Sequence, residues 1–199
     1  LRRSIDLVRA LMFPHEHHEG YCPCVRSNPL AQTLDELEFE RGIWNCAVYG
    51  DIRKLSSLLN SGTQVNELDN YGYTALHYAA RNGRLEVCKL LLEHGADASL
   101  TTNSMKATPL HRAAYAGHLN VVKLLTQANN SGRSRLVLLR DNDGDSCLHS
   151  AAKGRQKHVY DWLAETFPEL IPLQNNAGKT AEEAYFLPEA RLTSSSRTE

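Results

Sequence analysis

Three stretches of this chain repeat one short pattern: Thr74–Ala80 reads TALHYAA, Thr108–Ala114 reads TPLHRAA and Ser146–Ala152 reads SCLHSAA. The second copy begins 34 residues after the first, and the third begins 38 residues after the second. A period of this length is typical of proteins that stack supersecondary units. Each copy is followed by a second apolar segment with helical spacing, such as Val121 and Leu125. The sequence therefore predicts an all-α solenoid of helix-turn-helix units.

The pattern gives each of its residues a mechanical role. Leu76, Ala79 and Ala80 are three and four positions apart, so they share one face of a helix, and the small alanines let neighbouring helices approach closely. Thr74 stands where an N-cap hydroxyl can accept hydrogen bonds from free backbone amides. Gly83 follows at the left-handed position that commonly ends a helix. These roles predict short helices that pack closely in pairs.

Glycines punctuate the pattern, because Gly83 and Gly117 lie between the two helices of a unit and Gly95–Asp97 follows a second helix. With the T-x-L-H-x-A-A start, this punctuation resembles the ankyrin repeat. The resemblance implies an ankyrin-repeat solenoid with short hairpin loops, in which His77 and His111 stabilise the hairpins by hydrogen bonds. It also implies a module that binds another protein and has no enzymatic activity.

Less regular copies flank the three repeats. Arg41–Asp51 aligns with the first copy, with Trp44 in place of the histidine, and Asn176–Tyr185 begins a further copy with glutamates in place of Leu and His. Terminal units of a repeat protein change in this way because one of their faces meets no neighbour. We predict a repeat domain at 33–187 with units at about 36–68, 69–101, 102–139 and 140–174 and a truncated cap at 175–187, an irregular extension at 1–32 and a disordered tail at 188–199.

Composition and charge exclude several classes of protein. The chain is 42% apolar and 23% charged with a formal net charge of -1, so it is neither strongly basic nor disordered as a whole. A large nucleic-acid footprint is disfavoured, and no apolar run approaches the roughly 18 residues of a membrane-spanning helix. Five scattered cysteines argue against a disulfide framework. We expect a monomer of the cytoplasm or nucleus, without cofactor, nucleic-acid or membrane partner.

The N-terminal extension contains a group of histidines and cysteines. His15, His18, Cys22 and Cys24 are close enough in sequence to consider zinc, which takes imidazole and thiolate ligands. No second C-x-C or C-x2-C pair follows, so we predict a solvated histidine-rich arm and no metal. The alternative function is a regulatory subunit whose arm binds zinc or docks a second partner.

Catalytic patterns are not supported by the spacing. His77, His111 and His149 occupy equivalent positions in successive repeats, about 10 Å apart, so they cannot converge on one ion. Gly178–Thr180 imitates the end of a phosphate-binding loop, but the required earlier glycine falls on Leu173. We therefore predict that the chain is not an enzyme.

Binding is the remaining class, and the repeats indicate where it occurs. Variable residues at the hairpin tips and at the exposed ends of first helices form a concave strip that faces a partner. Tyrosine, methionine and arginine dominate the energetics of such interfaces. The alternative is that the tyrosines only cover the apolar edge of the stack. The predicted partner-binding residues of this adaptor or scaffold are Asn70, Tyr71, Tyr73, Arg81, Asn82, Met105, Tyr115, Asp143, Asp145 and Lys153.

Overall fold

A computed structural model describes residues 34–127 and 136–185, so the predicted extension at 1–32 and tail at 188–199 lie outside the described residues. Within the described ranges the chain is helical, and an isolated bridge between Gln174 and Thr180 is the only strand-like pairing there. The predicted all-α architecture is confirmed. The helices are α2 (Leu34–Arg41), α3 (Ile43–Tyr49), α4 (Ile52–Asn60), α5 (Ala75–Arg81), α6 (Leu85–Glu93), α7 (Pro109–Ala116), α8 (Leu119–Gln127), α10 (Cys147–Lys153), α11 (Lys157–Thr166), the 3₁₀ helix η2 (Pro168–Leu170) and α12 (Ala181–Tyr185).

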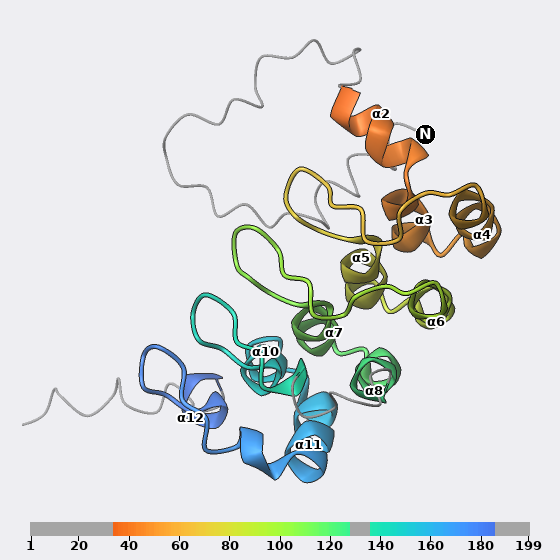
Figure 1. Cartoon of the computed structure of the whole chain (residues 1–199). Coiled ribbons are helices and arrows are strands. Elements are labelled where there is room, and N and C mark those ends of the chain that lie inside the picture. The colour runs from red at the N-terminus through yellow and green to blue at the C-terminus, as the bar shows by residue number, and fades with distance from the viewer. Residues whose placement is uncertain (1–33, 128–135, 186–199) are drawn as a thin grey trace, which may run out of the picture. The chain divides into compact units, whose positions relative to one another are not determined.

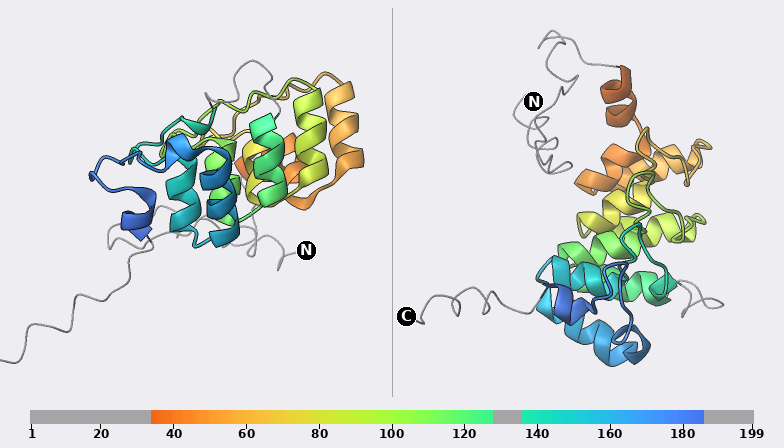
Figure 2. Two further views of the ribbon diagram at one scale, coloured as in Figure 1. Left: turned by 90° about the horizontal axis from the view of Figure 1, so that it is seen from below. Right: turned by 90° about the vertical axis from the view of Figure 1, so that its left-hand side faces the viewer.

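The helices form two layers of antiparallel pairs. The first helices α3, α5, α7 and α10 lie in one layer, and the second helices α4, α6, α8 and α11 lie in the other (Figure 1). Each helix packs against its equivalent in the next unit, so α5 contacts α3 and α7, and α6 contacts α4 and α8. Figure 2 shows the pairs following one another in chain order. Every central unit therefore depends on both of its neighbours.

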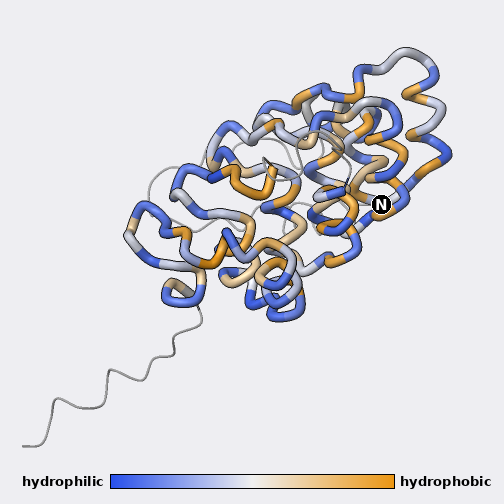
Figure 3. The backbone as a smooth tube through the Cα atoms, turned by 60° about the horizontal axis from the view of Figure 1, so that its bottom comes forward, coloured by the Kyte–Doolittle hydropathy of each residue, from blue (hydrophilic) through white to orange (hydrophobic). Residues whose placement is uncertain are grey.

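Apolar residues of the repeated pattern make the contacts between units. Leu76, Leu110 and Leu148 occupy the same position in α5, α7 and α10, and all three are fully buried. Burial of one leucine contributes about 1.5–3 kcal/mol. Figure 3 shows apolar residues recurring along the helices of each unit. The paired alanines beside these leucines are wholly buried as well, at Ala79, Ala80, Ala113, Ala114, Ala151 and Ala152.

A hydroxyl and a histidine begin each central first helix. The amide of Thr74 donates to Nδ1 of His77 (3.1 Å), and Nε2 of the same ring lies 3.1 Å from the carbonyl oxygen of Ala107 in the next unit. Because a backbone amide can only donate, Nδ1 accepts, and the proton on Nε2 is donated to Ala107. Each histidine therefore caps its own helix and links it to the following unit. The same arrangement joins Thr108 and His111 to Asp145 (3.2 Å), and Ser146 and His149 to Lys179 (3.1 Å).

The outer units replace the histidine differently at the two ends. Trp44 is buried, and its indole Nε1 donates to the carbonyl oxygen of Glu67 at 3.2 Å, so it still reaches the next hairpin. At the other end, Thr180 caps α12, and the Glu183 carboxylate accepts the Thr180 amide at 2.9 Å. Glu183 is exposed. The glutamate keeps the cap and makes no link to a further unit within the described residues.

Candidate functional site

One continuous surface presents the variable residues of the repeats. We define the inner face as the solvent-facing side chains of α3, α5, α7 and α10 together with the hairpin loops 61–74, 94–108 and 138–146. These loops project from the same side of the stack (Figure 1). Backbone bonds join successive hairpins: the Asn103 amide donates to Tyr71 (3.1 Å), and the Asn142 amide donates to Met105 (2.9 Å). The loops are thus fixed relative to one another.

Two positions of each first helix change in chemistry from unit to unit, and the second of them is half-buried or exposed on the inner face in all three units. The buried leucine, histidine and alanines recur in α5, α7 and α10, whereas these two positions do not. This division separates residues that build the stack from residues available for recognition. One position holds Tyr78, Arg112 and Ser150, and the other holds Arg81, Tyr115 and Lys153.

A cluster of aromatic and charged side chains occupies the centre of the inner face. The rings of Tyr73 and Tyr78 stack with centroids 5.3 Å apart, and the Arg112 guanidinium lies 5.2 Å from the centroid of the Tyr73 ring. Arg112 Nη2 donates to the Tyr73 hydroxyl at 2.5 Å. The Tyr78 hydroxyl donates to Asp69 at 2.5 Å, and the same carboxylate accepts the amide of Tyr71. These contacts tie hairpin 61–74 to α5 and α7.

Two predicted partner-binding residues are not exposed, so their assignment to an open strip is wrong. Tyr73 is only 8% exposed because it lies under Arg112 and against Tyr78. Asp145 is only 1% exposed, because its carbonyl oxygen accepts His111 Nε2 (3.2 Å) and its carboxylate accepts Asn175 Nδ2 (2.9 Å). Both residues hold hairpins in place.

The other predicted residues lie on the inner face with different exposures. Tyr71 and Tyr115 are 57% and 51% exposed. Asp143 and Lys153 are exposed and form a long ion pair of 4.0 Å. Contact with a partner by any of them stays a prediction. Among the remaining four, Asn70 is exposed and Arg81, Asn82 and Met105 are half-buried.

Three members of the central cluster were not predicted from the sequence, namely Asp69, Tyr78 and Arg112. The sequence does contain a signal for two of them, because Tyr78 and Arg112 occupy the variable position x after the histidine in the repeated L-H-x-A-A pattern. That place stands one helical turn before Arg81 and Tyr115, so it lies on the same side of the helix. For Asp69 the signal was local, since an aspartate that begins a hairpin commonly accepts amides two residues on.

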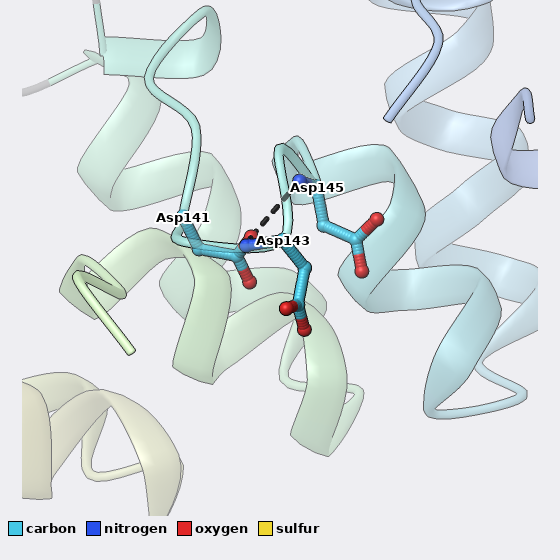
Figure 4. Close-up of side chains that lie close together, drawn as sticks. All are labelled: Asp141, Asp143 and Asp145. Carbon is cyan, nitrogen blue, oxygen red and sulfur yellow. Dashed lines mark hydrogen bonds between the residues drawn. The ribbon is translucent and has the colours of Figure 1, made fainter. Parts of the chain in front are cut away.

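Asp141, Asp143 and Asp145 bring carboxylate oxygens within 4.8 Å of one another in the hairpin before α10 (Figure 4). Oxygen ligands of this kind suit hard cations. However, the Asp141 carboxylate already accepts the amides of Asp143 and Asp145, both at 2.9 Å. Burial raises the pKa of Asp141. Because Asp69 makes the same turn in an earlier hairpin, the turn itself accounts for the acidic cluster.

The repeated units match a known protein family. Residues 43–135 match the family described as ankyrin repeats (3 copies). These units are ankyrin repeats. The ankyrin histidine thus has an observed role here, as the residue that caps one unit and bonds the next.

Relatives of the ankyrin region include proteins of different kinds. Ankyrin repeat domain-containing protein 39 of Homo sapiens is 45% identical over 86 residues, which are 41% of this chain and 46% of that protein. The Bos taurus protein of the same name is 48% identical over 66 residues, or 31% of this chain and 36% of the relative. Palmitoyltransferase Hip14 of Drosophila melanogaster is 40% identical over 101 residues, 51% of this chain but 15% of the relative. The matched segments span less than half the length of each relative.

The buried nucleophiles and bases of the ankyrin stack are engaged in structure. Burial lowers the pKa of His77 and of His111 to about 4, so both are neutral near pH 7. Cys46, Cys88 and Cys147 are buried free thiols, and burial raises the pKa of Cys88 and of Cys147 to about 12. Such thiols are poor nucleophiles, since the thiolate is the reactive form.

The candidate metal ligands His15, His18, Cys22 and Cys24 lie outside the described residues. Among the described helices, none has the length and apolar character needed to cross a membrane.

Proposed function

We propose that this chain is a non-catalytic adaptor or scaffold that binds a partner protein through the inner face of its ankyrin stack. Ankyrin repeats are generally protein-protein interaction modules. The observation that carries the proposal is the contrast between the buried pattern, which recurs in α5, α7 and α10, and the solvent-facing position that holds Arg81, Tyr115 and Lys153 in turn. Exposed residues that differ from unit to unit, on a scaffold of recurring buried residues, give the stack a surface suited to recognising one partner.

The chemistry of the inner face supports this role. Tyr71 and Tyr115 are large, amphipathic and more than half exposed. Exposed tyrosines contribute contact area at a low entropic cost, and arginine is likewise enriched among residues that dominate interfaces. The ladder of hairpin hydrogen bonds holds Tyr71 and Met105 in place before a partner arrives. Such preorganisation reduces the entropy lost on binding.

Catalysis receives no support from the similarity to palmitoyltransferase Hip14. The match to palmitoyltransferase Hip14 covers 15% of that protein, so most of it has no counterpart in this comparison. Within the described part of the chain, His77, His111 and His149 use their ring nitrogens in helix caps and in links between units. These histidines therefore have structural partners already.

Affinity capture with matched variants tests the proposal. The first variant, Tyr71→Ala with Tyr115→Ala, removes the two exposed tyrosines of the inner face. The control, Ile52→Ala with Ile171→Ala, removes two apolar residues of similar exposure outside the inner face. We expect specific proteins to be captured by the wild type and the control and to be lost from the tyrosine variant, with equal melting temperatures. Capture that survives in the tyrosine variant and fails in the control would place binding elsewhere.

A further inference from the structure

Two hollows lie side by side along the turns that join first helices to second helices. One, of about 220 Å³, lies between the first and second units, and the other, of about 400 Å³, lies between the second and third. Leu85 lines both hollows, so they form one continuous groove, which we call the turn groove. The hairpins join the opposite ends of the same helices. The turn groove therefore opens at the other edge of the stack from the hairpins.

Apolar residues line the turn groove at the first position of the second helices. Ile52, Leu85 and Leu119 begin α4, α6 and α8 in turn. Ile52 is 43% exposed, and the two leucines are half-buried. In the fourth unit Lys157 begins α11 and is exposed. A unit can therefore fold without an apolar residue at this position, and the three apolar side chains are available to contact another molecule.

Arg84 gives the turn groove a positive charge. Its Nε donates to the carbonyl oxygen of Val48 at 3.0 Å, and its Cδ lies 3.3 Å from the position of a Cβ on Gly50, so the side chain is held across the preceding turn. Arg84 is exposed and makes no ion pair within the described residues. A guanidinium presents five donors in a planar fork that matches a carboxylate. A ligand carboxylate would complement this charge.

The carboxylates nearest to Arg84 along the groove have other partners. Glu86 lines the same hollow as Arg84, and its Oε1 pairs with Nζ of Lys89 at 2.8 Å. Asp51 stands between two residues that line this hollow, and its Oδ1 accepts the Lys54 amide at 3.0 Å as the cap of α4. The protein thus offers Arg84 a carbonyl oxygen and leaves the carboxylate to a ligand.

The distance between units sets the shape of a ligand that follows the groove. Packed helices lie about 10 Å apart, and an extended chain advances by about 3.3 Å per residue. About three residues of an extended segment therefore match the step from one unit to the next. A segment with an apolar residue at every third position can place one beside each of Ile52, Leu85 and Leu119.

We infer that the turn groove is a second docking surface, which binds an extended segment of a partner protein. The segment carries an apolar residue at every third position and an acidic residue between two of them, opposite Arg84. This inference goes beyond the proposed function, because the inner face and the turn groove can each hold a partner.

A peptide-display library of random twelve-residue sequences, selected on the full chain, tests the turn groove. The turn-groove variant, Leu85→Gln with Leu119→Gln, replaces two apolar side chains of the groove by neutral polar ones. We expect one class of selected peptides to have apolar residues at every third position. Their affinity falls about tenfold or more on the turn-groove variant, because apolar contact is lost. Tyr71→Ala with Tyr115→Ala leaves their affinity unchanged within about twofold.

The charge of the ligand is tested with matched arginine variants. Replacing the shared Asp or Glu of a synthetic peptide by Asn or Gln weakens binding to the wild type about two- to fivefold, since the charge pair is exposed. The same replacement costs nothing further on Arg84→Gln. The control is Arg140→Gln, because Arg140 is also exposed and donates to a carbonyl oxygen, that of Gln174, but lies in hairpin 138–146. This control keeps the full effect of the peptide carboxylate.

Melting temperatures separate lost contact from lost folding. If the turn-groove variant melts well below the wild type, Ile52→Gln takes its place, because Ile52 is more exposed than the two leucines. Ile52→Gln should weaken the same peptides about threefold or more while melting as the wild type does. Ile52 belongs to a second helix and so lies outside the inner face.

The outcomes distinguish the turn groove from the inner face. Peptides that lose affinity only on Tyr71→Ala with Tyr115→Ala overturn the turn groove and leave the inner face as the binding surface. Selected peptides that bind the turn-groove variant as tightly as the wild type, or a library that yields no binder, also overturn it. Peptides of the groove without the period of three, or without coupling between their carboxylate and Arg84, overturn the chemistry assigned to the ligand.

Discussion

The same helix cap occurs in the middle of the stack and at its last described helix. In α7, the Thr108 amide donates to His111, and in α12 the Thr180 amide donates to Glu183. The two caps differ in the further contacts of the residue three positions after the hydroxyl, which is His111 in α7 and Glu183 in α12. The second nitrogen of His111 reaches the carbonyl oxygen of Asp145 in the following unit, whereas Glu183 is exposed.

The difference shows that the residue three positions after the capping hydroxyl decides whether the cap also bonds a neighbouring unit. An imidazole has two polar atoms on opposite sides of a flat ring, so it can satisfy its own helix and bond a neighbour. A carboxylate serves the cap equally well but prefers water on its remaining side. Histidine in the middle and glutamate at the end thus follow from solvent exposure.

Mild acid should produce the largest effect, because it acts on the buried histidines of the central caps. The pKa of His77 and of His111 is lowered to about 4 by burial, against 6.5 in an unfolded chain. The unfolded state therefore takes up protons first, so stability is complete above about pH 6.5 and falls as the pH approaches 4. We expect a loss of about 2–3 kcal/mol per histidine near pH 4.5, measured from urea midpoints.

Substitution of an exposed histidine provides the control for this pH dependence. His94 is exposed on the surface of the stack, so the His94→Gln variant should show the pH dependence of the wild type. Urea midpoints that stay constant between about pH 7.5 and pH 4.5 would mean that the central histidines titrate normally in the folded state.

The second prediction compares the packing at the centre with the exposed face. Leu110→Ala opens a cavity between α5, α7 and α10, where Leu110 is fully buried. We expect it to lower the free energy of unfolding by about 2–5 kcal/mol. Chemical denaturation measures this directly. A loss below about 1 kcal/mol would indicate that neighbouring units close over the cavity.

Removal of the hydroxyl from the two caps sharpens the comparison itself. Thr108→Ala should cost about 2 kcal/mol, since Thr108 is fully buried, and Thr180→Ala should cost about 0.5 kcal/mol at the partly exposed end. The melting temperatures of the two variants measure the difference between these two losses of stability. Equal losses would mean that burial does not distinguish the central cap from the terminal one.

The smallest effect on stability is expected at an exposed position of the same helix α7. Tyr115→Ala should change the free energy of unfolding by less than about 0.5 kcal/mol, because the ring is 51% exposed. Thermal melting beside Leu110→Ala is the measurement. If Tyr115→Ala lowers the melting temperature as much as Leu110→Ala, the tyrosine is part of the stack and its assignment to the binding surface is wrong.

The helices and caps were predictable because their signals are local and periodic. The spacing of Leu76 and the alanines, and the left-handed glycines Gly83 and Gly117, with φ of 67° and 85°, all follow from the repeated pattern. The all-α ankyrin architecture follows from the same residues.

The exposure of individual hairpin residues was not predictable in the same way. Tyr73, Ala107 and Asp145 each precede the cap residue of a first helix, and all three are buried. The carbonyl oxygens of Ala107 and Asp145 accept the histidine of the preceding unit, so the backbone fixes this position whatever the side chain. Because the side chains are as different as tyrosine, alanine and aspartate, no hydrophobic period marks the position as buried.

The links made by the capping histidines all run in one direction along the stack. Each ring that caps a first helix donates toward the C-terminal neighbour, from His77 to Ala107 and from His111 to Asp145, whereas His118 and His158 bond back to carbonyl oxygens of the preceding unit. Trimming units from the N-terminus would leave every remaining capping histidine bonded to its acceptor, whereas trimming from the C-terminus would remove the acceptor of the last capping imidazole. Shortened versions of this protein should therefore keep every link made by a capping histidine when the first unit is lost, and lose one such link when the last is removed.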